Sequence, residues 1–206
     1  MRTLIFIFCT TILLACKKPR TIKIIAENVV TGARYAGLSY QVVSSRTTTN
    51  GEKYQTDAEG VLNNNGEAVV DVNVKKGRSY SVRIGALDNI CYHNELSQYF
   101  NSPYDVNGTF TFKFAECAYS KLIIKNVNCQ SGNDKIELFR QDQIGSLSNT
   151  GWVQYGCVNW ETNGYSDVPM GIRFYKWEVT RNSLTETFYD TIYLNAGEYK
   201  TYEINY

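Results

Sequence analysis

Apolar and polar residues alternate in short segments along the chain after residue 20, and no long stretch shows a helical period. The segments are rich in Val, Ile, Thr, Tyr and Phe, and Gly, Asn, Asp and Ser separate them, which is typical of strands joined by turns. Val70, Val72 and Val74, for example, share one face of an expected strand. The pattern predicts an all-β protein with strands at Thr21–Asn28, Leu38–Ser45, Ala68–Val74, Ser79–Ile84, Thr109–Phe114, Lys121–Val127, Lys135–Arg140, Gly171–Thr180, Thr185–Leu194 and Lys200–Tyr206.

Turn residues at regular intervals, such as Asn50-Gly51 and Lys76-Gly77, favour antiparallel β-sandwiches over a parallel sheet with helical crossovers. The length fits either one large sandwich or two small ones. We favour two domains, residues 21–117 and 118–206. In this interpretation 91–108 is one long loop, and strand character restarts at Lys121 without a flexible linker.

The first residues have the pattern of an export signal. Arg2 precedes an uncharged block, Leu4–Leu14, and Ala15 precedes Cys16. A membrane-spanning helix needs about 20 apolar residues, more than this block supplies before Lys17-Lys18-Pro19. Residues 1–15 are therefore predicted to be a cleaved signal peptide.

The order of a cation, an apolar block and Leu13-Leu14-Ala15-Cys16 resembles the lipobox of bacterial lipoproteins. The resemblance implies that Cys16 carries fatty-acid chains such as palmitate and that 16–20 tether the protein to a membrane. Lys17 is not the aspartate that favours inner-membrane retention in related lipoproteins. The resemblance therefore implies an outer-membrane location, and we expect the periplasmic leaflet.

Part of the first domain resembles carboxypeptidase-regulatory and transthyretin-like modules. The resemblance rests on Thr31-Gly32, on the segment 35–42 and on the expected turn Thr56-Asp57-Ala58-Glu59-Gly60, and it covers residues 21–86. It implies a non-catalytic β-sandwich of the immunoglobulin or transthyretin-like kind, and no active-site residues carry over.

Charge excludes one class of partner. Without residues 1–15 the chain has twenty basic and twenty acidic residues, whereas nucleic-acid binding requires a basic surface. We therefore expect no nucleic-acid partner.

Four cysteines remain after Cys9 is removed with the signal and Cys16 is acylated: Cys91, Cys117, Cys129 and Cys157. In an oxidising compartment four cysteines form two disulfides, with three possible connectivities. We favour Cys91–Cys117 and Cys129–Cys157, because each bridge then lies within one domain. A zinc site is disfavoured by the cysteine spacing, and we predict no metal or other cofactor.

The sequence shows few of the residues that catalysis would require. His93 is the single histidine, and no nucleophile motif accompanies it. Asp57-Ala58-Glu59-Gly60 lacks the later ligands of a calcium loop. We expect no enzymatic activity, and the alternative is an envelope hydrolase with an unrecognised site.

Aromatic residues give the one candidate binding surface. Trp152, Tyr155, Trp160 and Tyr165 lie close together in the sequence, and exposed rings of this kind bind sugars or anchor proteins. Packing in the core is the favoured alternative. The sequence thus predicts a membrane-tethered, non-enzymatic envelope protein with a structural or binding role, whose partner is an envelope protein or a glycan.

Overall fold

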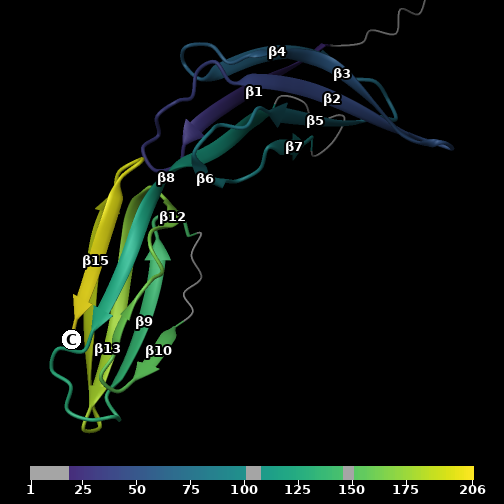
Figure 1. Cartoon of the computed structure of the whole chain (residues 1–206). Coiled ribbons are helices and arrows are strands. Elements are labelled where there is room, and N and C mark those ends of the chain that lie inside the picture. The colour runs from purple at the N-terminus through teal and green to yellow at the C-terminus, as the bar shows by residue number, and fades with distance from the viewer. Residues whose placement is uncertain (1–18, 101–107, 146–150) are drawn as a thin grey trace, which may run out of the picture.

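The structure, a computed structural model, describes residues 19–100, 108–145 and 151–206. In these ranges the chain forms fifteen strands and no helix (Figure 1), which confirms the all-β class. The signal peptide, Cys16 and most of the tether lie outside the described residues. The strands are β1 (Pro19–Asn28), β2 (Ser39–Thr48), β3 (Gly51–Val61), β4 (Glu67–Asn73), β5 (Ser79–Ile84), β6 (Ile90–His93), β7 (Ser97–Tyr99), β8 (Thr109–Lys125), β9 (Lys135–Asp142), β10 (Trp152–Tyr155), β11 (Asn159–Glu161), β12 (Ser166–Pro169), β13 (Gly171–Arg181), β14 (Leu184–Leu194) and β15 (Tyr199–Asn205).

The first sandwich consists of two sheets around one hydrophobic core. β4, β1, the first half of β8 and β6 form one sheet, and β3, β2, β5 and β7 form the other. Ile22, Ile24 and Phe112 of the first sheet meet Val42 and Val82 of the second, and each is at most 1% exposed.

The second sandwich has its own core. One sheet has the order β10-β9-β13-β14, and in the other the second half of β8 lies between β15 and the short strands β11 and β12. Ile124 and Ile204 of one sheet pack with Ile136 and Leu138 of the other. Burial of these apolar side chains provides the main driving force for folding of each half.

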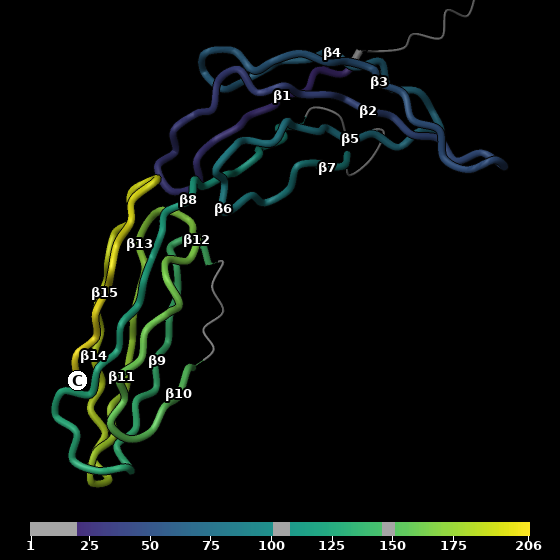
Figure 2. Tube along the Cα trace, in the orientation of Figure 1, coloured from purple at the N-terminus to yellow at the C-terminus, as the bar shows by residue number. Residues whose placement is uncertain are grey.

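β8 belongs to both sandwiches. Figure 2 shows this strand passing from one pair of sheets into the other. The prediction of separate strands at Thr109–Phe114 and Lys121–Val127 is therefore wrong. The residues between them continue the strand because β6 pairs with β8 as far as Glu116, and β12 pairs with it from Cys117 to Ser120.

Two strand pairs are parallel, which corrects the expectation of purely antiparallel sheets. β1 runs parallel to the first half of β8, and β15 runs parallel to its second half. In each sandwich the first strand lies beside the last, so the two sandwiches have a similar topology. The sheet orders β3-β2-β5-β7 and β10-β9-β13-β14 also correspond.

β3 is a long strand that the sequence did not predict. The expected turn Thr56–Gly60 lies inside it, and Asp57 is the extra residue of a β-bulge, since Val42 pairs with Ala58 and Val43 with Thr56. The expected loop 91–108 likewise contains most of β6 and all of β7. These segments are polar or short, so their sequences carry little strand pattern.

Both disulfides of the favoured pairing are present. Cys91–Cys117 joins β6 to β8 at the junction of the sandwiches, with a Cα–Cα distance of 4.8 Å. Cys129–Cys157 joins the β8–β9 connection to the β10–β11 connection, with a Cα–Cα distance of 5.2 Å. Within its ranges, the structure has no helix long and apolar enough to cross a membrane.

Candidate binding surfaces

The two tryptophans singled out from the sequence pack against the second core. Trp152 lies on β10 and Trp160 on β11, in different sheets, and their ring centroids are 4.9 Å apart. Both are half-buried against the core residues. The chain turns between them at Gly156, whose φ is positive.

The two tyrosines of the same set lie elsewhere. Tyr155 is 67% exposed and pairs with Lys135 at the end of β10. Tyr165 contacts Tyr199 edge-on at 5.2 Å between centroids, and Tyr199 of β15 stacks on its neighbour Tyr119 of β8, in the sheet that does not contain β10. The structure therefore does not bring the four predicted aromatic residues together in one surface.

A different aromatic surface lies on the outer face of the β10-β9-β13-β14 sheet. Phe174 is 42% and Tyr189 74% exposed. Together with Phe139 they border a shallow hollow of about 290 Å³, which we call the aromatic hollow. It is lined by Phe139, Gln141, Phe174, Tyr175, Lys176 and Tyr189.

Strand alternation explains why these rings face solvent. On β13, Tyr175 and Val179 are buried in the core, so Phe174 and Lys176 lie on the opposite face. Phe139 lies directly across from Lys176 on β9. The sequence contained this signal, since both faces of β13 carry aromatic residues, but it did not show which face the other sheet covers.

A cation lies beside the rings of the hollow. The Lys176 ammonium is 4.9 Å from the centroid of the Phe139 ring and 2.6 Å from Glu178 Oε1. The hydrogen bond to Glu178 raises the pKa of Lys176, so its charge is retained at neutral pH. The hollow thus combines apolar rings with a hydrogen-bond donor, as ligand sites commonly do.

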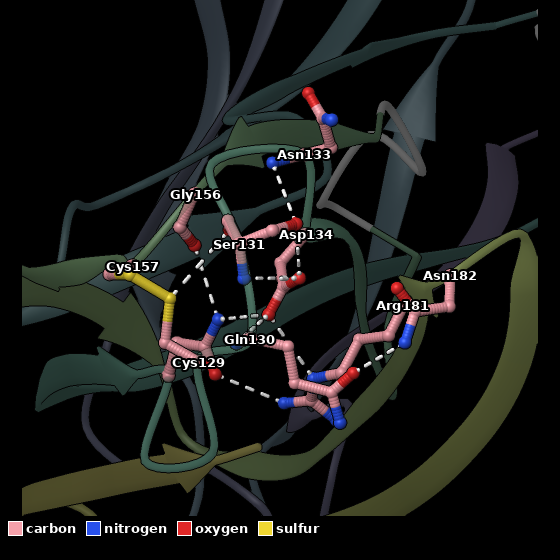
Figure 3. Close-up of polar contacts among 10 residues, drawn as sticks. Cys129, Gln130, Ser131, Asn133, Asp134, Gly156, Cys157, Arg181 and Asn182 are labelled. Atoms are coloured by element: carbon pink, nitrogen blue, oxygen red, sulfur yellow. Dashed lines mark hydrogen bonds and ion pairs between the residues drawn. A yellow bond between two sulfur atoms is a disulfide. The ribbon is translucent and has the colours of Figure 1, made fainter.

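Asp134 (Figure 3) has the most strongly shifted pKa among the carboxylates in the described part of the second sandwich. It is 1% exposed and accepts hydrogen bonds from the Gln130 N–H at 3.0 Å, from Ser131, and from Asn126 Nδ2 at 3.1 Å. Arg181 Nε lies 3.4 Å away.

These contacts, of which the backbone hydrogen bond from Gln130 is the largest cause, lower the pKa of Asp134 to about 2. Because its oxygens are occupied by protein donors, the carboxylate secures the loop before β9. That loop also carries the Cys129–Cys157 bridge.

His93 occupies an exposed position on β6, opposite Phe114. No cluster of three or more metal-ligating side chains occurs within residues 19–100, 108–145 and 151–206.

Comparison with known proteins assigns no family. No family model and no curated protein match the chain. Similar solved structures include the shaft pilin SpaA from Lactobacillus rhamnosus GG, with 7% identity over 91% of this chain and 97% of that chain and a TM-score of 0.38. The minor pilin of Streptococcus agalactiae has 10% identity over 90% and 94%, with a TM-score of 0.35.

The Bacillus anthracis TIE protein has 14% identity over 90% of this chain and 33% of that chain, with a TM-score of 0.32. With TM-scores below 0.5, these similarities assign neither a family nor a function.

Proposed function

We propose that this protein is a lipid-anchored, non-enzymatic component of a bacterial cell envelope that binds its partner through the second of two domains, residues 21–117 and 118–206. Anchoring at Cys16 is supported by the lipobox pattern Leu13–Cys16. Export is supported by the two disulfides, since such bonds persist in oxidising compartments.

The aromatic hollow carries the proposal for binding. Exposed rings at Phe174 and Tyr189 offer flat apolar area, and Lys176 and Gln141 offer hydrogen-bond donors beside it. A sugar ring stacks on such a surface, and an apolar side chain of a protein fits it equally well. The partner class is therefore an envelope glycan or an envelope protein.

The position of the hollow fits a tethered molecule. A tether of residues 16–20 holds the first domain beside the outer membrane, on its periplasmic side in this proposal. The second sandwich lies at the end of the first sandwich that is opposite to the start of β1 (Figure 1). Tethering raises the effective concentration of the binding surface near the membrane, so that a weak site is sufficient.

Site-specific crosslinking in intact envelopes tests this function. A photo-crosslinking residue at Gln141, in the hollow, should capture a glycan or a protein, and one at the exposed Gln55 on β3 should capture much less. Phe174→Ala should reduce capture from Gln141 about tenfold. Tyr199→Ala, which removes another exposed ring from the other sheet, should leave it unchanged. Equal capture from Gln141 and Gln55 would show that the hollow is not the binding surface.

The absence of catalysis has a separate test. An enzyme that uses acid–base chemistry at neutral pH would depend on His93, the single histidine of the chain. In a deletion strain, a His93→Ala variant should restore every phenotype as the wild-type protein does. A Phe174→Ala variant should not restore them. The reverse result would favour a hydrolase.

A further inference from the structure

β14 is an edge strand with one side paired and one side open. It pairs with β13 along its whole length, from the Arg181–Leu184 pair to the Gly171–Leu194 pair. On the other side, no described residue forms a strand beside it. The strand has eleven residues, and every side chain from Leu184 to Thr191 is exposed. Long free edges of this kind pair readily with other strands.

The turn that precedes β14 determines which backbone groups face the open side. Asn182 and Ser183 have φ values of 48° and 65°, as in a two-residue hairpin turn, and Arg181 and Leu184 form the closing pair. In an antiparallel ladder alternate residues bond to the partner strand. Leu184, Glu186 and every second residue after them therefore bond to β13, and the N–H and C=O groups of the residues between them face outward.

Two side chains already occupy the outward groups at one end of this edge. The Thr191 N–H donates to Asp190 Oδ1 at 2.7 Å, and the Tyr193 carbonyl accepts from Lys200 Nζ at 3.0 Å. Within the described ranges, no such partner contacts the outward groups of Thr185, Thr187 and Tyr189. The half of β14 nearer the turn is therefore the open half.

Exposed apolar side chains gather on the same half. Leu184 is 75%, Tyr189 74% and Phe188 38% exposed. Edge strands are commonly protected by charged side chains that oppose pairing. Here the open half, residues 184–189, has one charged residue, Glu186.

We infer that the open half of β14 pairs with the same segment of a second copy of this chain, antiparallel and centred on Thr187. In this register Thr187 lies opposite its own counterpart, and Thr185 lies opposite Tyr189 of the other copy. Each of these pairs exchanges two backbone hydrogen bonds across the new interface, because their N–H and C=O groups are the outward ones.

The side chains favour a second copy in this register. Glu186 lies opposite Phe188, and Leu184 lies opposite Asp190, so no two acidic residues face each other. A register centred on Phe188 would place Glu186 opposite Asp190, and like charges directly opposite are destabilising. The ring of Tyr189 covers Thr185 of the other copy on the outer face.

The position of the open half leaves room for the second copy. It lies at the end of the second sandwich that is distant from the first sandwich (Figure 1). An antiparallel pair therefore overlaps only at these ends, and the two first sandwiches point away from each other. The inference does not rest on ligand binding in the aromatic hollow, although Tyr189 belongs to both surfaces.

Cysteine crosslinking of the full chain in the envelope tests the pairing. Opposite residues in such a pair have Cα atoms about 5.5 Å apart, within reach of a disulfide. Thr187→Cys should give a covalent homodimer on a non-reducing gel at more than about ten times the yield of Thr191→Cys, a matched control on the same strand and face. Differently tagged copies with Thr185→Cys and Tyr189→Cys should form a mixed dimer.

A second variant separates loss of pairing from misfolding. Thr187→Pro removes an outward N–H and leaves the bonds to β13 intact, so it should fold and should reduce the mixed dimer at least about tenfold. Thr191→Lys should leave the mixed dimer unchanged. Equal dimer yields from Thr187→Cys and Thr191→Cys, no dimer at all, or crosslinks to another protein alone would overturn the inference.

Discussion

Asn28 and Glu116 are hydrogen-bonded where the two sandwiches meet, with Asn28 Nδ2 donating to Glu116 Oε2. Asn28 ends β1 and is 3% exposed, and Glu116 lies in the middle of β8. The Asn28 amide also lies 3.1 Å from Tyr35 Oη and 3.4 Å from the Sδ atom of Met170, which follows β12. One buried side chain therefore links residues of both sandwiches.

Glu116 also acts on the Tyr35 hydroxyl. Burial, and then the hydrogen bond and charge of Glu116, raise the pKa of Tyr35, so its hydroxyl stays protonated. The junction is thus a small polar network whose members depend on one another.

Asn28→Ala should lower the free energy of unfolding by about 1–3 kcal/mol, because it leaves buried polar groups of its partners without a hydrogen bond. Urea denaturation followed by fluorescence measures this change. Asn128→Ala, which alters an exposed asparagine, should change stability by less than about 0.5 kcal/mol. Equal effects of the two substitutions would contradict a special role for Asn28.

The sequence predicted the strands that alternate over many residues, such as β4 and β13, because one face of each is covered by core. It did not predict β3, since the bulge at Asp57 and the glycine Gly60 interrupt its pattern. The continuity of β8 depends on pairing with β6 and β12, which are separate segments of the sequence.

The location of the binding surface could not be predicted from the sequence for a similar reason. Trp152 and Trp160 were candidates because of their residue type, but contacts with the second core half-bury them. Phe174 and Tyr189 are exposed because of the face on which they lie. Alternation separates two faces of a strand, and only the packing of the sheets decides which face meets solvent.

Thiol titration checks the disulfides. After denaturation without reductant, Cys91, Cys117, Cys129 and Cys157 should give no free thiol, because both bridges are present in the fold. Replacing both Cys129 and Cys157 with Ser should cost about 3–4 kcal/mol of stability in the chain-entropy model. Two or more free thiols in the wild-type protein would contradict the pairing.

Acylation of Cys16 is tested by metabolic labelling. Labelled fatty acid should enter the wild-type protein but not Cys16→Ser, since the lipobox pattern predicts this thiol as the acceptor. Cys9→Ser, which alters a cysteine inside the predicted signal peptide, should be labelled like the wild type. After separation of the membranes, the labelled protein should be found in the outer-membrane fraction. Equal labelling of wild type and Cys16→Ser would exclude the proposed anchor.

Asp134 predicts a specific pH dependence of stability. Its pKa is lowered to about 2 in the folded protein, from an ordinary value of 3.8, mainly by the Gln130 backbone hydrogen bond. A carboxyl group whose folded pKa is depressed stabilises the protein above its unfolded pKa, and this contribution is lost as the pH falls through the folded pKa. The stability difference between wild type and Asp134→Asn should therefore be largest near pH 6 and should shrink between about pH 4 and pH 2.

Urea denaturation at several pH values measures this difference, with a second aspartate as the control. Asp88→Asn, at an exposed position, should change the free energy of unfolding by less than about 0.5 kcal/mol. A difference for Asp134→Asn that stays constant from about pH 6 to pH 2 would show that its carboxylate charge does not secure the loop before β9.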